Sequence, residues 1–103
     1  MSVKVLQINF KFKIPSADLK NGLAPFVNDI AAVSGLRWKI WIMNEQENEA
    51  GGIYLFDDED SMQAYLEGPI IAGLKTNPAL SDISAKQFNV VEDFTTDTRG
   101  PIK

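Results

Sequence analysis

Hydrophobic and polar residues alternate strictly along residues 5–13, VLQINFKFK. Leu6, Ile8, Phe10 and Phe12 therefore share one face of an extended chain, while polar side chains occupy the other face. A period of two is typical of a β-strand that is buried mainly on one side. The pattern predicts a first strand that directs four large apolar side chains into a core.

After this strand, apolar residues recur at steps of three and four between residues 19 and 30. This spacing predicts an amphipathic helix. Gly22 and Pro25 fall inside the pattern, so we expect a kink or a break near them. Gly35 is well placed to cap the carboxyl end of this helix.

Two tryptophans lie three residues apart in the next segment, LRWKIWIMNE, residues 36–45. On a helix Trp38 and Trp41 would share one face, whereas on a strand they point to opposite faces. β-branched and aromatic residues dominate the segment, which follows a helix stop, and this favours a strand. Strict alternation then divides the side chains into two sets. One set comprises Leu36, Trp38, Ile40 and Ile42, and the other comprises Arg37, Lys39, Trp41 and Met43.

A polar turn, NEQEN, connects this strand to a second run of strand-forming residues, EAGGIYLF, residues 49–56. The two runs predict a β-hairpin with large apolar residues on both of its faces. Gly51 and Gly52 indicate a bulge or a close approach of two backbones. Lys39 is expected either as a surface charge or in a cross-strand ion pair with Glu49.

Four consecutive acidic residues, 57–60, predict the amino end of a second helix, where the helix dipole favours negative charge. They do not fit a calcium-binding EF-hand loop, because Gln63 and Pro69 stand where that loop needs glycine and glutamate. Gly68 and Pro69 break the helix, and a short helical piece follows. The sequence then predicts a loop, a last strand over residues 84–92 and a tail without periodicity.

The predicted order of elements is β-α-β-β-α-β within a single domain that spans residues 1–103. This order is typical of a ferredoxin-like α+β fold, in which both helices cover one face of a four-stranded antiparallel sheet. The second face carries apolar residues of the hairpin and needs a cover of its own. We expect a second copy of the chain, packed sheet against sheet, so the pattern predicts a homodimer.

Composition removes several classes of function. The chain has no cysteine and no histidine, so it offers no thiolate or imidazole ligand and no metal site is predicted. The net charge is −4 and the ten basic residues are scattered, which argues against a nucleic-acid partner. No run of about 18 apolar residues and no secretory leader is present, so we expect a cytoplasmic protein with no membrane association.

The predicted hairpin resembles that of a known family. Its most specific elements are the Trp-Lys-x-Trp pattern of residues 38–41 and the EAGGIYLF of residues 49–56. Together with the acidic turn and the tail sequence TRGPI, they make the chain resemble the YdhR-like putative monooxygenases of the dimeric α+β barrel superfamily. The resemblance implies sheet-to-sheet pairing. The tail, residues 93–103, has no periodicity but carries Phe94 and Ile102, so we expect contact with the partner chain, and not a fold of its own, to order it. The expected dimer-interface residues are Trp41, Lys39, Ile53, Leu55 and Phe94.

The resemblance also implies an activity. Relatives of this family include cofactor-independent oxygenases that act on polycyclic aromatic compounds. In their chemistry an activated phenol or anthrone loses a proton, the carbanion passes an electron to O₂, and the radical pair recombines. The protein then supplies a dry apolar pocket, a base and hydrogen-bond donors for oxyanion charge. We therefore expect a monooxygenase of aromatic or phenolic compounds that needs no cofactor. The alternative is a non-catalytic dimer that binds a small ligand or serves as an accessory protein.

In the wider superfamily the ligand cavity lies between the sheet and the helices, and the resemblance implies the same cavity here. Trp38 is then expected in the cavity and Trp41 against the partner, although both tryptophans also suit core packing. Tyr54 and Trp38 are the expected catalytic residues. The Tyr54 phenol either orients or deprotonates a substrate hydroxyl, or is a buried phenol bonded to a backbone carbonyl. The expected substrate-binding residues are Ile8, Phe10, Phe26, Ile30, Trp38, Tyr54, Phe56 and Tyr65.

Overall fold

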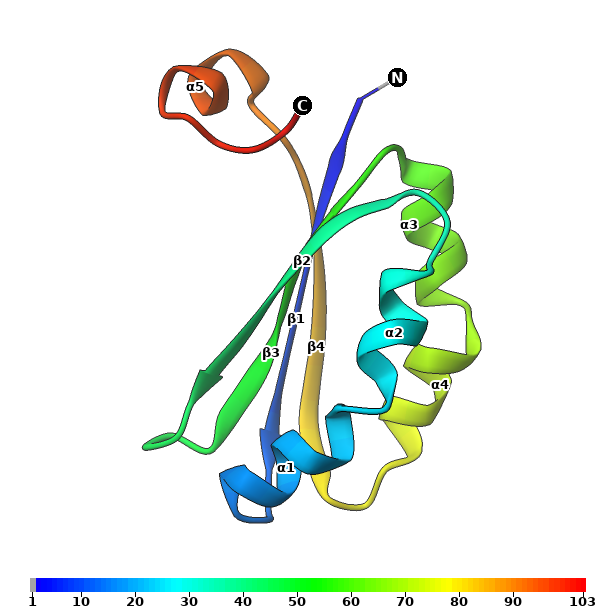
Figure 1. Ribbon diagram of the computed structural model, residues 1–103, viewed down its shortest axis with the longest axis vertical. Helices are drawn as coiled ribbons and strands as arrows, with labels where there is room; N and C mark the ends of the chain where they lie inside the picture. Colours follow the sequence, from blue (N-terminus) through cyan, green and yellow to red (C-terminus); the bar gives the residue numbers. More distant parts are fainter. Residues whose placement is uncertain (1) are drawn as a thin grey trace.

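A four-stranded antiparallel sheet with helices packed on one face forms the body of the protein (Figure 1). The computed structural model describes residues 2–103. The expected ferredoxin-like order is confirmed, with both predicted helical regions split in two and one further helix in the tail. In chain order the elements are β1 (Lys4–Phe12), α1 (Ser16–Leu23), α2 (Phe26–Ala31), β2 (Leu36–Asn44), β3 (Glu49–Phe56), α3 (Glu59–Leu66), α4 (Pro69–Thr76), β4 (Leu80–Asn89) and α5 (Glu92–Asp97).

The sheet has the strand order β2-β3-β1-β4, so the first strand pairs with both β3 and β4. Its predicted apolar set faces α1–α4, and Leu6, Ile8 and Phe10 are at most 5% exposed. We call this side of the sheet the helix face. The opposite side, which we call the open face, is formed by Val5, Trp38, Ile40, Ile53, Leu55 and Phe88.

A bulge at Arg37 changes which residues of β2 point to each face. Leu36 pairs with Phe56 and Trp38 pairs with Leu55, so two steps along β2 correspond to one step along β3. Arg37 is the extra residue. One inserted residue exchanges the faces of everything beyond it. Leu36 consequently packs in the core under the helices, whereas Trp38 lies on the open face.

The prediction of strict alternation along residues 36–45 is therefore wrong at its first step. Lys39 and Trp41, which we expected at the dimer interface, are on the helix face beside Tyr54 and Gly52. Trp38, which we expected in the cavity, is on the other side of the sheet.

The helix breaks follow the sequence signals. The first helical region is interrupted at Ala24–Pro25, and Gly68 separates α3 from α4. The predicted acidic start of α3 is confirmed, because the Asp58 side chain accepts a hydrogen bond of 2.8 Å from the backbone N–H of Ser61.

Gly35 has a different role from the one expected. Helix α2 ends at Ala31, with Ala32 as its cap, so Gly35 lies beyond the helix. Its φ of +84° belongs to the left-handed region that favours glycine, and a Cβ there would lie 2.1 Å from Ser61 Oγ. This glycine brings the start of β2 close to α3.

The last part of the chain is more regular than the sequence suggests. β4 begins at Leu80 instead of residue 84, and Asp82, with a φ of 53°, lies at the irregularity in its pairing with β1. The tail forms helix α5 and turns back toward the end of the sheet near the N-terminus, on the side away from α1–α4 (Figure 1). The expectation of a tail without regular structure is corrected.

The tail is fastened to its own chain at the open face. The indole Nε1 of Trp38 donates a 2.7 Å hydrogen bond to the carbonyl of Pro101, and Arg37 donates to the carbonyl of Ile102. Ile102 packs with Val3 and Leu55, and Leu55 is fully buried. Leu55 is consequently covered within one chain and offers no surface to a partner, which corrects its assignment to the dimer interface. Phe94, in contrast, is 70% exposed.

Candidate functional site

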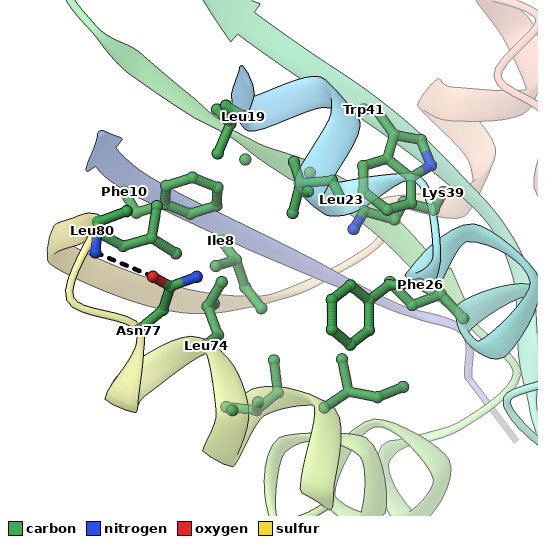
Figure 2. A pocket seen from close by; sticks show the side chains of 18 of the residues that line it. Ile8, Phe10, Leu19, Leu23, Phe26, Lys39, Trp41, Leu74, Asn77 and Leu80 are labelled. Carbon is green, nitrogen blue, oxygen red and sulfur yellow. Dashed lines mark hydrogen bonds between the residues drawn. The ribbon is translucent and has the colours of Figure 1, made fainter. Parts of the chain in front are cut away.

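An apolar cavity lies between the helix face of the sheet and helices α1, α2 and α4 (Figure 2). Its volume is about 130 Å³. An apolar cavity of roughly 150 Å³ is known to hold benzene, so this space fits a single aromatic ring. Phe26 and Trp41 line it and are 44% and 40% exposed, so a larger molecule can extend past them into solvent.

Most of the residues expected to bind substrate line this cavity. They are Ile8, Phe10, Phe26, Ile30, Tyr54 and Tyr65. Two of the expected residues do not. Phe56 is fully buried, with its ring 6.0 Å from the Tyr54 ring, and supports the tyrosine from behind. Trp38 lines a second hollow between the open face and the tail.

Several cavity residues were not singled out from the sequence. Leu19 and Leu23 on α1 close one side, and Ile70 and Leu74 on α4 close another. The apolar periodicity of these residues indicated only that they are buried. No signal in the sequence distinguished residues that line a cavity from residues that pack in a closed core. Asn77, beyond the end of α4, also reaches the cavity, and its side-chain oxygen accepts a 2.9 Å hydrogen bond from Ala79 N.

Two tyrosine hydroxyls form the polar centre of the cavity wall. Tyr54 on β3 and Tyr65 on α3 approach to 3.0 Å between their hydroxyl oxygens, and their rings lie 5.1 Å apart. Burial, and then the neighbouring Tyr65, raise the pKa of Tyr54 far above its ordinary value, and burial also raises the pKa of Tyr65. Both phenols therefore stay protonated. One hydroxyl donates to the other, so the pair has one hydroxyl proton left to donate to a ligand.

This geometry corrects two expectations for Tyr54. It cannot serve as a base at neutral pH, because a phenol with a raised pKa does not give up its proton there. Its hydroxyl is bonded to another side chain and not to a backbone carbonyl. A donor to a substrate oxygen is the chemical role that remains.

Lys39 brings a positive charge to the same wall. Its ammonium nitrogen lies 3.4 Å from the centroid of the Trp41 ring and 4.5 Å from that of Tyr54 (Figure 2). Gly52 leaves room for the Lys39 side chain, because a Cβ at Gly52 would lie 2.3 Å from Lys39 Cε. The ammonium interacts with two aromatic faces, an arrangement that stabilises a cation in an apolar place.

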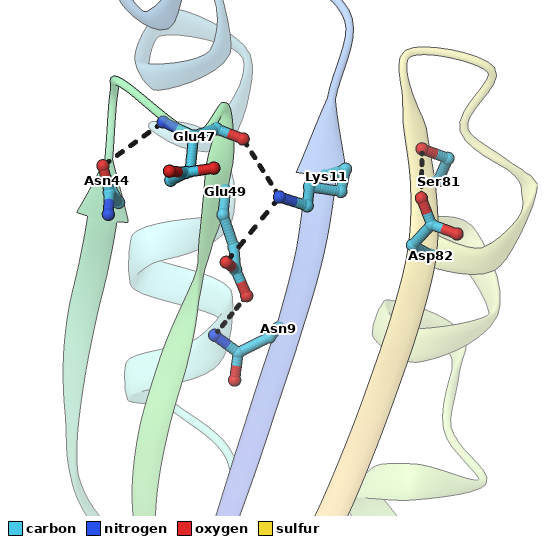
Figure 3. Close-up of polar contacts among 7 residues, drawn as sticks. All are labelled: Asn9, Lys11, Asn44, Glu47, Glu49, Ser81 and Asp82. Carbon is cyan, nitrogen blue, oxygen red and sulfur yellow. Dashed lines mark hydrogen bonds and ion pairs between the residues drawn. The ribbon is translucent and has the colours of Figure 1, made fainter.

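The expected pair between Lys39 and Glu49 does not form. Glu49 instead pairs with Lys11 at 3.9 Å and accepts a hydrogen bond of 3.3 Å from Asn9 on the open side (Figure 3). Within residues 2–103, no carboxylate lies within ion-pair distance of Lys39. Burial lowers the pKa of Lys39 to about 8.

The arrangement can hold a flat aromatic molecule and act on a polar group that it carries. Apolar walls exclude water, the tyrosine pair donates a hydrogen bond, and an amine with a pKa of about 8 can take up a proton or face a negative charge. Metal-ligand chemistry is not indicated: over residues 2–103 there is no group of three or more acidic side chains that could hold an ion.

The fold and the cavity together define a small ferredoxin-like α+β protein with an apolar cavity between its sheet and its helices. The chain matches the family model described as "Putative mono-oxygenase ydhR" over residues 5–101, and it belongs to that family. No protein with a curated function matches it significantly. In the described part of the chain, every helix is too short or too polar to cross a membrane.

Several solved structures share this fold. The NE2512 protein of unknown function from Nitrosomonas europaea has 25% sequence identity and a TM-score of 0.74, covering 88% of this chain and 91% of its own. SnoaB, a cofactor-independent oxygenase from Streptomyces nogalater, has 16% identity and a TM-score of 0.72, covering 89% and 96%. The heme-degrading MhuD from Mycobacterium tuberculosis has 20% identity and a TM-score of 0.65, covering 84% and 95%.

Proposed function

We propose that this protein is a cofactor-independent monooxygenase that acts on small phenolic or enolisable aromatic compounds. The observation that carries the proposal is the cavity itself, which combines apolar walls of one-ring size with the paired hydroxyls of Tyr54 and Tyr65. The family membership and the fold shared with SnoaB add support for oxygenase chemistry.

The proposed reaction draws its electrons from the substrate. An activated methylene, as in an anthrone, loses a proton to give a carbanion, which passes one electron to O₂. The radical pair combines to a peroxide, which takes up a proton and loses water, so that CH₂ and O₂ become C=O and H₂O. The tyrosine pair donates a hydrogen bond to the developing oxygen charge, and the apolar walls keep water from the carbanion.

Oxygen consumption with an anthrone tests this proposal. The expected result is uptake of one O₂ per anthrone, above the rate without protein, in the presence of EDTA and with no flavin added. Tyr54→Phe should lower the turnover rate with little change in KM, because it deletes one hydroxyl and almost no volume. Ligand binding without protein-dependent oxygen uptake would instead identify a non-catalytic binding protein.

We also propose that the protein works as a homodimer joined through the open face. Ile40, Val91 and Phe94 are 51%, 57% and 70% exposed, and Ile53 lies on the same face. An exposed apolar surface of this kind is typical of association sites. A second copy packed there would leave the cavity on the helix face accessible and would place the tail beside the partner.

The charge of −4 and the scattered basic residues support a small aromatic molecule, and not a nucleic acid, as the other partner.

A further inference from the structure

The ammonium group of Lys39 is the one cationic group that lines the cavity in the described part of the chain. Its own strand and β3 place the rings of Trp41 and Tyr54 against it. The other titratable group of the lining is Tyr65 on α3, while β1, α1, α2 and α4 contribute only uncharged side chains. A positive charge thus lies at an apolar ligand space with no negative charge to balance it.

This arrangement is costly unless something occupies the cavity. A half-buried ammonium loses part of its hydration, and the two aromatic faces replace only some of it. The glycine at position 52 keeps the lysine in this place, because any larger residue would displace it. A bound anion would supply the missing partner. The cavity has room for such an anion on a single aromatic ring, and its apolar and aromatic walls favour one.

We propose that the cavity takes its aromatic ligand as a phenolate or enolate anion, with the Lys39 ammonium as the counter-ion. The inference rests on the proposed function for the identification of this ligand as the substrate. Deprotonation is the step that makes such a compound reactive toward O₂, so the residue that stabilises the anion also selects substrates that can form it.

The proton balance of binding is simple. Below the pKa of Lys39 the amine is already an ammonium, and the bound phenol releases its proton to solvent. Above it, the neutral amine accepts the phenol's proton directly, and an ammonium–phenolate pair forms with no net release. In both cases the ion pair lowers the pKa of the bound phenol. An apolar cavity without the lysine would raise that pKa, because burial disfavours the charged form.

The colour of 4-nitrophenol distinguishes these outcomes, since its phenolate absorbs visible light. We expect saturating wild-type protein to lower the pKa of 4-nitrophenol by one unit or more, which is a tenfold or greater preference for the anion. Lys39→Met should abolish this shift or reverse its sign. Lys11→Met is the matched control, because Lys11 pairs with Glu49 outside the cavity, and it should behave as wild type.

A comparison that uses only the wild-type protein keeps the test independent of the variant's folding. 4-Nitroanisole has the same ring but cannot ionise, and it should bind at least tenfold more weakly than 4-nitrophenol at pH 8. A bound 4-nitrophenol with an unchanged or raised pKa, equal binding of the two compounds, or no binding of 4-nitrophenol would each overturn the inference. Anion binding without oxygen uptake from anthrones would reject the oxygenase and retain the anion site. Oxygen uptake that Lys39→Met leaves unchanged would retain the oxygenase and reject Lys39 as the counter-ion of a bound substrate anion.

Discussion

Two adjacent glycines in β3 allow a sharp test of how the cavity is built. A Cβ at Gly51 would lie 1.9 Å from the carbonyl oxygen of Ile8, a backbone atom in the centre of the sheet. A Cβ at Gly52 would lie 2.3 Å from Lys39 Cε, near the free end of a flexible side chain. The same substitution therefore meets a rigid obstacle at one position and a movable one at the next.

The expected magnitudes follow from these contacts. Gly51→Ala forces β1 and β3 apart, and overpacking of this kind costs about 3 kcal/mol. Gly52→Ala displaces the Lys39 ammonium and loses a cation–π contact of about 0.5–2 kcal/mol. Removing a glycine from a strand returns about 0.5–1 kcal/mol, so the net loss should not exceed about 1.5 kcal/mol.

Urea unfolding followed by circular dichroism measures both variants on one scale. Gly51→Ala should be less stable than Gly52→Ala by about 2 kcal/mol, or roughly 10 °C in Tm for a domain of this size. Gly52→Ala should also lose the preference for the 4-nitrophenolate anion while remaining folded. A stable Gly51→Ala protein, or a Gly52→Ala protein that unfolds as readily, would refute the described packing of β3.

Three further predictions concern the open face, the tail and the amine of Lys39. Ile40→Glu should weaken dimer association by about 2–4 kcal/mol, because the dimer would bury an unpaired charge. Sedimentation equilibrium measures this change, and a wild-type protein that is monomeric at micromolar concentration would contradict the dimer. Trp38→Phe removes the indole donor to Pro101 and should cost about 0.5–1.5 kcal/mol, with faster amide exchange in the tail; unchanged exchange would argue against this tether. Burial lowers the pKa of Lys39 to about 8 in the folded chain, below the ordinary value of 10.5. The unfolded chain then binds more protons between these values, and the free energy of unfolding should rise from pH 8 to pH 10.5. Lys39→Met should lack this rise, and an equal rise in that variant would assign it to other groups.

The sequence predicted the fold because its local signals agree with one another. The alternation of β1, the proline and glycine breaks and the capping acidic residues each determine an element without help from distant contacts. The tail was missed because residues 92–97 have no apolar periodicity. The end of the tail is held by hydrogen bonds from Arg37 and Trp38 to the carbonyls of Ile102 and Pro101, more than 60 positions later in the chain.

The candidate site was harder to predict because its key orientation depends on one residue. The bulge at Arg37 leaves no mark in the hydrophobic pattern, yet it exchanges the faces of Trp38 and Trp41. The cavity residues on β1 and α2 and the two tyrosines could be inferred from the expected packing of helices on one face of the sheet. The role of Lys39 could not, because it arises from the combination of the bulge, the space at Gly52 and the missing carboxylate.

The proposed function requires that an aromatic substrate be oxygenated in this cavity without a cofactor. Turnover of an anthrone under isotope-labelled O₂, with EDTA present and no flavin, tests it most directly by mass spectrometry of the product. We expect one labelled oxygen atom in each product molecule, formed at a rate that Tyr54→Phe lowers and Lys11→Met leaves unchanged. Product without label, or labelled product formed no faster than in buffer alone, would contradict it.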